Sequence, residues 1–417
     1  MPLSYDAAPE WENATALEEP PLGIYLHFPW CLQKCPYCDF LSIPAAREVI
    51  PHAAYADAVI NELSARAPWA GNRPVHSIFV GGGTPSLWQP QQLGRVLTAI
   101  RQHFELSEQI EITVECNPSS FDRSVAEALL GLGVNRVSIG VQGLDNQRLQ
   151  FLGRLHDARG ALAAVNDALR AGVPRVSADL IFGVHGQSVD QAVEEARTLA
   201  ELGITHLSAY SLTIEAGTAF GALHKKGRLP LLDEDTAARM FLALDDQLSP
   251  LGFDHYEISN YAKAGHYSRH NLGYWLGWDY LGIGCGAWGT ITENGMGLRY
   301  RNTQSADRYI TASRDWPQTD LRASAKSKGE AVGLIDQTEI LDAETRLRER
   351  ILLGLRLHGG LDLEQAAQRA TAEAWTPARR QAVQKLTSRG RLAQEGNRIW
   401  VPKEAWLFAD ATISELL

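Results

Sequence analysis

Three cysteines lie within eight residues near the N-terminus, in the run CLQKCPYC at residues 31–38. Cys31, Cys35 and Cys38 follow an apolar run, and thiolates at this CxxxCxxC spacing can bind a metal centre from one side. Structural zinc normally has four protein ligands, usually from two CxxC pairs, and no second pair is present. A [4Fe-4S] cluster held by three cysteines leaves one iron with a free coordination position. The spacing therefore favours an iron–sulfur cluster, and a zinc site that recruits His27 or another histidine is the alternative.

A glycine-rich turn, GGGTP at residues 81–85, directly follows the β-rich run SIFV. Glycine lets a ligand approach the backbone, and the end of a strand suits a nucleoside or an amino-acid group. The turn is not a phosphate-binding P-loop, and it lacks the GxGxxG spacing of dinucleotide sites. By itself, such a turn is more often a tight strand exit. In the same chain as the cysteine run, it indicates a cofactor site.

The elements that must position these motifs form a repeating pattern of β-rich and helical runs. Six β-rich runs are expected to be strands, at residues 23–28, 77–80, 111–115, 136–141, 176–181 and 206–210. Helical runs separate them, and two of these runs end at Gly133 and Gly172, as a left-handed C-cap would. Strands that alternate with helices predict a largely parallel sheet. We expect an α/β fold, either a partial (β/α)6 barrel or, if the sheet stays open and flat, a doubly wound sheet.

After Leu212 the pattern changes. Aromatic and glycine-rich runs follow, and a turn-rich segment at residues 313–330 is typical of a linker. From Glu344 onward, helical runs lead to RLAQEGNRIWVP, a hairpin pattern with Gly396 and Asn397 at its turn. This ending predicts a small winged-helix-like module. The predicted division is an acidic tail at 1–20, the partial barrel at 21–225, an extension that closes the barrel at 226–340 and the C-terminal module at 341–417.

Charge limits the classes of partner. Among 417 residues, 39 Lys and Arg stand against 49 Asp and Glu, which gives a formal net charge of -10. A nucleic-acid binder needs a basic surface to replace the counterions of the phosphates, so we expect no nucleic-acid partner. For the same reason, we interpret the winged-helix-like module as a packing or protein-contact unit.

The expected location follows from the N-terminus and the cysteines. The first residues have neither the basic start nor the apolar run of a secretory signal, and no apolar run approaches the ~18–20 residues of a membrane span. A cysteine cluster in a chain with five cysteines suits a reducing compartment, so we expect a cytoplasmic protein with no transmembrane segment. We interpret the isolated Cys116 and Cys285 as buried small apolar residues.

Together the motifs resemble those of a known family. The run YLHFPWCLQKCPYC followed by GGGTP resembles the radical S-adenosylmethionine superfamily, within it the branch of the oxygen-independent coproporphyrinogen III oxidases and the HemW heme chaperones. The resemblance extends from about Gly23 to the C-terminal module. It implies that Cys31, Cys35 and Cys38 each bind one iron of a [4Fe-4S] cluster, and that the amino and carboxylate groups of S-adenosylmethionine chelate the fourth iron.

The resemblance also implies which residues contact S-adenosylmethionine. The matching positions are Tyr25, Tyr37, Gly82, Gly83, Thr84, Glu115, Gln142, Arg154 and Asp179. Glu115, Gln142 and Asp179 lie at or near expected strand ends, which meet at one mouth of a barrel. Carboxylates there can hold ribose hydroxyls or an ammonium group, and Arg154 can meet the carboxylate of the cofactor.

Two features separate the branches of this family. The oxidases carry a further cysteine two residues after the third, where this chain has Phe40. The run HNLGYW at residues 270–275 matches the HNxxYW pattern of the HemW branch. That match implies a protein that binds heme and transfers it to an acceptor protein, with His270 as a candidate axial ligand and with His27 and His266 as weaker candidates. The sequence identifies neither the acceptor nor the electron donor.

Besides a structural or regulatory protein with a zinc site, which remains open only if iron is absent, there are two further alternatives. The first is an enzyme, a coproporphyrinogen III oxidase that decarboxylates propionate side chains by radical chemistry. The second concerns His270 alone, which could be a hydrogen-bonded structural residue beside aromatic core residues, since most histidines do not bind heme.

Overall fold

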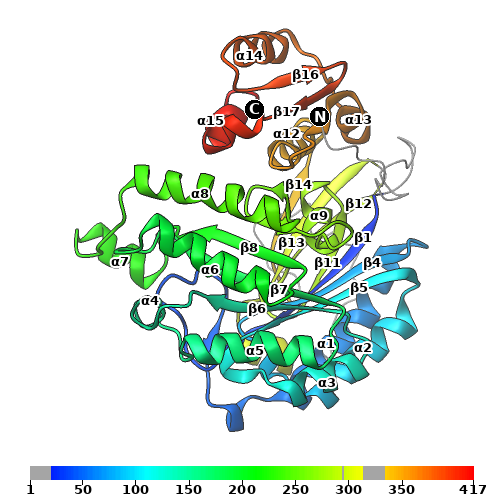
Figure 1. Ribbon diagram of the computed structural model, residues 1–417. Coiled ribbons are helices and arrows are strands. Elements are labelled where there is room, and N and C mark those ends of the chain that lie inside the picture. The colour runs from blue at the N-terminus through cyan, green and yellow to red at the C-terminus, as the bar shows by residue number, and fades with distance from the viewer. Residues whose placement is uncertain (1–19, 294, 313–333) are drawn as a thin grey trace.

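The computed structural model describes residues 20–293, 295–312 and 334–417, and its centre is a twelve-stranded sheet (Figure 1). The strand order is β14-β13-β12-β11-β1-β4-β5-β6-β7-β8-β10-β9. Its core consists of consecutive parallel strands, namely β1 (Leu22–Phe28), β4 (Val75–Gly82), β5 (Leu106–Cys116), β6 (Arg136–Gln142), β7 (Arg175–Phe182) and β8 (His206–Ser211). Each contains one of the predicted strands. The prediction of an α/β fold with a partial (β/α)6 barrel is confirmed.

Helices connect the parallel strands and cover the outer face of the sheet (Figure 1). The connecting helices are α1 (His52–Arg66), α2 (Pro90–His103), α3 (Arg123–Gly131), α4 (Asn146–Phe151), α5 (Ala158–Arg170) and α6 (Val189–Glu201). Two further helices, α7 (Ala219–Lys225) and α8 (Glu234–Leu248), follow β8 and lead to the antiparallel edge. In α5, a stripe of small apolar residues from Ala161 to Ala168 is buried, as the helical period requires. The predicted C-caps are confirmed, because φ is 89° at Gly133 and 83° at Gly172.

The sheet continues beyond these strands at both edges. β11 (Asp279–Ile283) pairs with β1 in parallel, and β12 (Trp288–Glu293), β13 (Met296–Asn302) and β14 (Ile335–Leu341) follow in antiparallel order. At the other edge, β10 (Asn260–Ala262) and β9 (Asp254–Glu257) are antiparallel. The short helices of this region are α9 (Arg269–Trp275) and α10 (Ala306–Thr311). β1 therefore has a parallel neighbour on each side, and the cysteine run that follows it leaves from the middle of the sheet.

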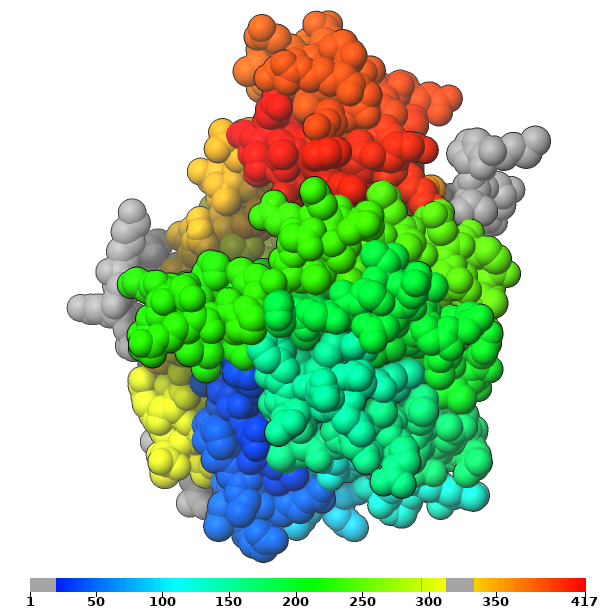
Figure 2. Space-filling view, turned by 60° about the vertical axis from the view of Figure 1, so that its left-hand side comes forward, coloured from blue at the N-terminus to red at the C-terminus, as the bar shows by residue number. Residues whose placement is uncertain are grey.

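The C-terminal part forms a lobe at the end of the molecule (Figure 1, Figure 2). Its elements are α12 (Ala343–Gly354), β15 (Leu361–Asp362), α13 (Leu363–Ala370), α14 (Pro377–Ser388), β16 (Ala393–Glu395), β17 (Arg398–Trp400) and α15 (Ala409–Ser414). Its apolar side chains form a core cluster of their own. β16 and β17 form the predicted hairpin, and Gly396 in its turn has a φ of 59°.

Some predictions fall outside this description. The linker predicted at 313–330 and, except for its last residue, the tail predicted at 1–20 lie outside the described residues. The limits of the predicted domains remain predictions. Within the described ranges, no helix is both long enough and apolar enough to cross a membrane.

Candidate functional site

The cysteine run leaves β1 and is closed at its base by two short strands. β2 (Trp30–Cys31) pairs in parallel with β3 (Ile43–Pro44). Cys31 is buried, whereas Cys35 and Cys38 are partly exposed on the loop between these strands. The backbone N–H of Cys38 donates to the carbonyl oxygen of Cys35 at 3.1 Å, which forms a turn. The loop thus presents three free thiols from one compact segment.

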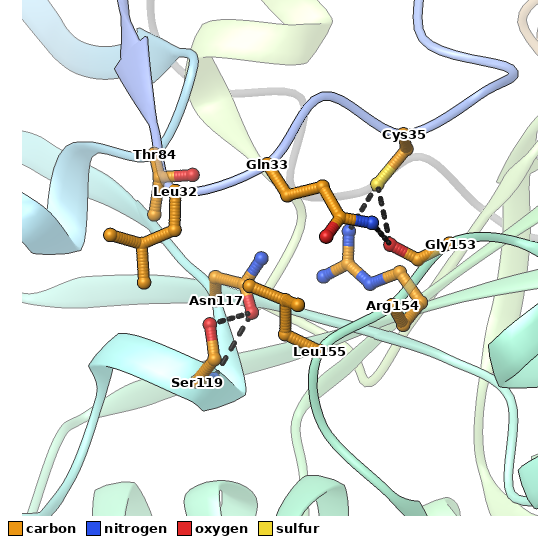
Figure 3. A pocket seen from close by; sticks show the side chains of 9 residues that line it. All are labelled: Leu32, Gln33, Cys35, Thr84, Asn117, Ser119, Gly153, Arg154 and Leu155. Atoms are coloured by element: carbon orange, nitrogen blue, oxygen red, sulfur yellow. Dashed lines mark hydrogen bonds between the residues drawn. The ribbon is translucent and has the colours of Figure 1, made fainter. Parts of the chain in front are cut away.

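Contacts with the turn after α4 hold the middle of this loop (Figure 3). Gln33 Nε2 donates to Gly153 O at 3.3 Å, and the Cys35 thiol lies 3.7 Å from the same oxygen. Arg154 Nη1 lies 3.4 Å from Cys35 Sγ, while Arg154 Nη2 donates to Gly140 O at 3.0 Å. The guanidinium is therefore fixed from β6 beside the cysteine loop. Its buried Nε has no hydrogen-bond partner among the described residues, so one donor remains for a ligand.

Gly82 and Gly83 bring the end of β4 against the start of the cysteine run. A Cβ added to Gly83 would lie 2.5 Å from Trp30 O and 2.8 Å from Pro29 O. A Cβ on Gly82, whose φ is 116°, would lie 2.7 Å from the ring of His27. Only glycine allows these approaches. The glycines are thus required by the packing of the chain on itself, and they also leave the backbone open toward the cavity described next.

A cavity of about 500 Å³ brings most of the predicted residues together, and this volume is within the usual range of small-molecule sites. Its lining includes Cys31, Cys35, Tyr37, Cys38, Gly82, Gly83, Thr84, Glu115, Gln142, Arg154 and Asp179. Tyr25 lies outside this lining. Its hydroxyl is hydrogen-bonded to His27 Nδ1 at 2.9 Å, and its ring stacks on Phe79.

Glu115 and Asp179 supply carboxylates to the cavity. Glu115 Oε2 accepts from the Gly82 N–H at 3.1 Å, and Asp179 accepts from Ser138 Oγ at 2.9 Å and from Ser177 Oγ at 3.4 Å. Burial, together with the charge of Asp179, raises the pKa of Glu115 to about 8. Burial raises the pKa of Asp179 to about 6, despite its serine hydrogen bonds. Because a nearby cation favours the ionised forms, the pair is suited to a positively charged ligand group.

Gln142 ends β6 in an uncommon backbone conformation. Its φ is 66°, in the left-handed region, and the register of β6 against β7 shifts between Ile139 and Gln142. The Gln142 side chain lies over Gly140, where an added Cβ would be 2.9 Å from Gln142 Nε2. Backbone strain of this kind is concentrated at ligand sites. The irregularity therefore agrees with a binding role at this strand end.

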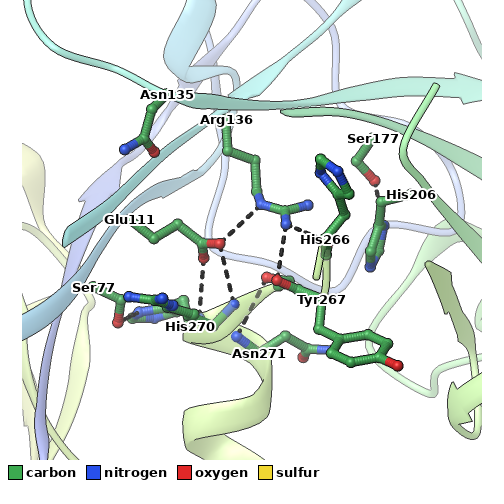
Figure 4. A network of polar contacts seen from close by, with 12 residues as sticks. Ser77, Glu111, Asn135, Arg136, Ser177, His206, His266, Tyr267, His270 and Asn271 are labelled. Atoms are coloured by element: carbon green, nitrogen blue, oxygen red, sulfur yellow. Dashed lines mark hydrogen bonds and ion pairs between the residues drawn. The ribbon is translucent and has the colours of Figure 1, made fainter. Parts of the chain in front are cut away.

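His270 belongs to a buried polar network beside the cavity (Figure 4). Its Nδ1 is hydrogen-bonded to Ser77 Oγ at 2.8 Å and its Nε2 to the Tyr274 hydroxyl at 3.0 Å. The ring stacks on Phe79 and is 4% exposed, and burial lowers its pKa to about 4. Both ring nitrogens are engaged. Axial ligation of heme by His270, which stays a prediction, would require one of these hydrogen bonds to break.

The other predicted alternatives can be compared with the geometry. His27 Nδ1 bonds to the Tyr25 hydroxyl and His27 Nε2 to Leu41 O, each at 2.9 Å, so the zinc alternative finds no free nitrogen on this ring. Cys116 and Cys285 are buried in the main apolar core, as expected. In the described ranges, no three His, Cys, Asp or Glu side chains are grouped so that they could hold a single metal ion.

Several lining residues were missed by the sequence reasoning. Ser138 and Ser177 position Asp179, and Arg136 lies 1% exposed in the same cavity wall, paired with Glu111 at 2.9 Å (Figure 4). The available signal was the two-residue period of a strand, because positions 136, 138, 140 and 142 of β6 all line the cavity. Polar residues at alternate positions of a barrel strand point to the site.

The residues fit a [4Fe-4S] cluster and S-adenosylmethionine. Three thiols from one loop line one cavity, and the free Nε of Arg154 is complementary to a carboxylate. Glu115 and Asp179 are complementary to the ammonium and sulfonium groups of the cofactor.

The chain is similar to known proteins along most of its length. The radical SAM superfamily matches residues 25–199, and the HemN C-terminal domain matches residues 341–408. The heme chaperone HemW of Escherichia coli is 40% identical over 308 residues, which cover 72% of this chain and 80% of the relative. The heme chaperone HemW of Mycobacterium tuberculosis is 34% identical over 400 residues, or 95% of each chain.

A mitochondrial relative and a solved structure extend the comparison. The radical S-adenosyl methionine domain-containing protein 1 of Bos taurus is 39% identical over 283 residues, which cover 68% of this chain and 63% of the relative. The solved structure of coproporphyrinogen III oxidase (HemN) from Escherichia coli aligns with a TM-score of 0.77 at 21% identity, covering 95% of this chain and 90% of that one. At this identity the alignment supports the fold only.

Proposed function

Since the chain belongs to the HemW family of the radical SAM superfamily, whose members carry the name heme chaperone, we propose that it binds heme and transfers it to an acceptor protein. The observation that carries the proposal is the match to a heme chaperone along nearly the whole chain, barrel and C-terminal lobe included. We further propose that the protein carries a [4Fe-4S] cluster and S-adenosylmethionine, which are typical of the superfamily.

Phe40 supports the chaperone over the oxidase. It stands two residues after Cys38, where the oxidases carry a further cysteine, and its side chain is 62% exposed at the rim of the cofactor cavity. A phenyl ring has no group that binds iron or transfers a proton. Coproporphyrinogen III oxidation is therefore the competing outcome of the test below, and not a second proposal.

Within this proposal, each cavity residue has a defined task. Cys31, Cys35 and Cys38 hold three irons, and the free Nε of Arg154 binds the carboxylate of S-adenosylmethionine. Asp179, fixed by two serine hydroxyls, accepts hydrogen bonds from polar groups of the cofactor. When bound, the cluster and the cofactor supply one-electron chemistry at this end of the cavity. Free thiols reserved for iron need a reducing compartment, so we propose a cytoplasmic location.

The experiment is anaerobic reconstitution with iron and sulfide, followed by two assays on one sample. We expect heme titration to saturate at one heme per chain and coproporphyrinogen III to remain unconverted with S-adenosylmethionine and reductant. Turnover on the order of one per second or faster would overturn the proposal, as would missing heme binding. Iron content and the response to S-adenosylmethionine are measured on the same sample, so that an inactive preparation is not mistaken for a non-enzyme.

A further inference from the structure

A second cavity, of about 640 Å³, lies where the C-terminal lobe meets the extension of the sheet. α9 and α12 form one wall, and residues of β11, β12, β13 and β14 form the other, in the region where Figure 1 shows these elements together. Asn271 is the only described residue that lines both this cavity and the cofactor cavity. Neither the cluster nor S-adenosylmethionine accounts for this second space.

Aromatic side chains give this cavity its shape. They are Tyr274, Trp275, Trp278, Tyr280 and Trp288. The rings of Tyr274 and Tyr280 pack edge to face with their centroids 4.8 Å apart, and Trp288 is 40% exposed. The buried Nε1 of Trp275 has no hydrogen-bond partner in the described part of the chain. Walls of this kind suit a flat aromatic ligand that carries a few polar groups.

Only some of the charged side chains that line this cavity form ion pairs with described residues. Arg299 binds Glu349 at 2.7 Å and Glu339 at 3.4 Å, and Asp279 is paired with Arg73 at 2.6 Å. Each of the three carboxylates in the lining, those of Asp279, Glu339 and Glu349, therefore already has an arginine partner.

Two arginines of α12 have no acidic partner among the residues that the structure describes. Arg346 donates to the carbonyl oxygens of Gly295 and Arg369, and Arg350 donates to those of Leu276 and Gly277. Across the described residues, neither forms an ion pair. Burial and the charges of Arg369 and Arg346 lower the pKa of Arg350 to about 10. Two cations close together in a partly buried wall favour an anionic ligand.

We propose that this second cavity is the heme site, with the porphyrin between the aromatic side chains and its propionates toward Arg346 and Arg350. This inference rests on the proposed function and adds the place where heme binds. It explains why a chain whose His270 is fully engaged can still hold heme, because the ring is bound by apolar contact and its two carboxylates by the α12 arginines. Heme and S-adenosylmethionine would then occupy separate cavities.

The test fills or truncates the cavity and measures heme affinity by absorbance titration. Leu353→Trp places a larger side chain on α12 in the lining of the cavity. Trp288→Ala removes an aromatic side chain from the lining, and because this side chain is partly exposed, its loss should not disturb the fold. Leu242→Trp is the matched control, on the exposed side of α8 and outside both cavities. We expect about tenfold weaker heme binding for Leu353→Trp, a severalfold loss for Trp288→Ala and no change for the control. Iron content and the response to S-adenosylmethionine should be the same in all three.

Heme dimethyl ester serves as a second probe, because it keeps the ring and lacks the propionate charges. We expect the wild type to bind the ester about tenfold more weakly than heme, as the loss of charge-assisted hydrogen bonds predicts. Equal affinity for both probes would overturn the assignment of the arginines. If the wild type binds heme, and Trp288→Ala and a folded Leu353→Trp bind it with the same affinity, the assignment of this cavity as the heme site is wrong. The proposed function would be unaffected by that result. If Leu353→Trp does not fold, Trp288→Ala alone decides. A wild type that does not bind heme would overturn the proposed function itself.

Discussion

Gly83→Ala tests the close packing between β4 and the cysteine loop. The added Cβ would lie 2.5 Å from Trp30 O, 2.7 Å from Trp30 C and 2.8 Å from Pro29 O. Ordinary contacts of a Cβ begin at 3.4 Å, so the two segments must separate by about 0.9 Å. The atoms in the way are backbone, and no side-chain rotation can relieve the overlap. Because Trp30 directly precedes Cys31, the first thiol of the loop must move as well.

An overpacked position of this kind lowers the free energy of unfolding by about 1–3 kcal/mol. We expect the cluster-free variant to unfold at a lower temperature than the wild type, and to retain less iron after anaerobic reconstitution. The matched control is Gly131→Ala at the end of α3, where an added Cβ has no neighbour within 4 Å. That change should leave stability equal or slightly higher, because alanine favours the helix. If Gly83→Ala matches the wild type in both unfolding temperature and iron content, the proposed packing requirement is wrong.

Three further predictions concern the cofactor cavity. Cys35→Ala should abolish the cluster, whereas Cys116→Ala and Cys285→Ala should keep about four irons per chain by metal analysis; zinc in anaerobically purified protein would contradict this. Asp179→Ala should weaken the EPR change that S-adenosylmethionine causes in the reduced cluster without removing iron, and an unchanged titration would count against the assigned pocket. The pKa of Glu115 is raised from 4.5 to about 8, so protonation of this carboxyl stabilises the cluster-free fold. The stabilisation is complete below pH 4.5 and is lost as the pH rises through 8. Glu115→Gln should therefore flatten the dependence of unfolding temperature on pH over this range, and parallel profiles for both proteins would refute the shift.

The sequence alone determined the elements whose signals are local. Strand and helix periods alternate along the first half of the chain, and Gly133 and Gly172 end helices where only a left-handed cap continues to the next strand. The spacing of Cys31, Cys35 and Cys38 is also local, since all three thiols belong to one loop. These features depend on neighbours a few residues apart, which is why they could be read without a structure.

Only the tertiary structure decided which polar groups form hydrogen bonds with one another and which have a donor or acceptor free for a ligand. His270 is engaged by Ser77, 193 residues away, and Arg154 reaches Cys35 across 119 residues. The elevated pKa of Glu115 comes from burial in the cavity and from a carboxylate on another strand. The second cavity exists only because α12 is packed over strands that lie earlier in the chain. Such properties depend on distances between segments that are remote in sequence, and those distances are set by the packing of the whole sheet and its helices.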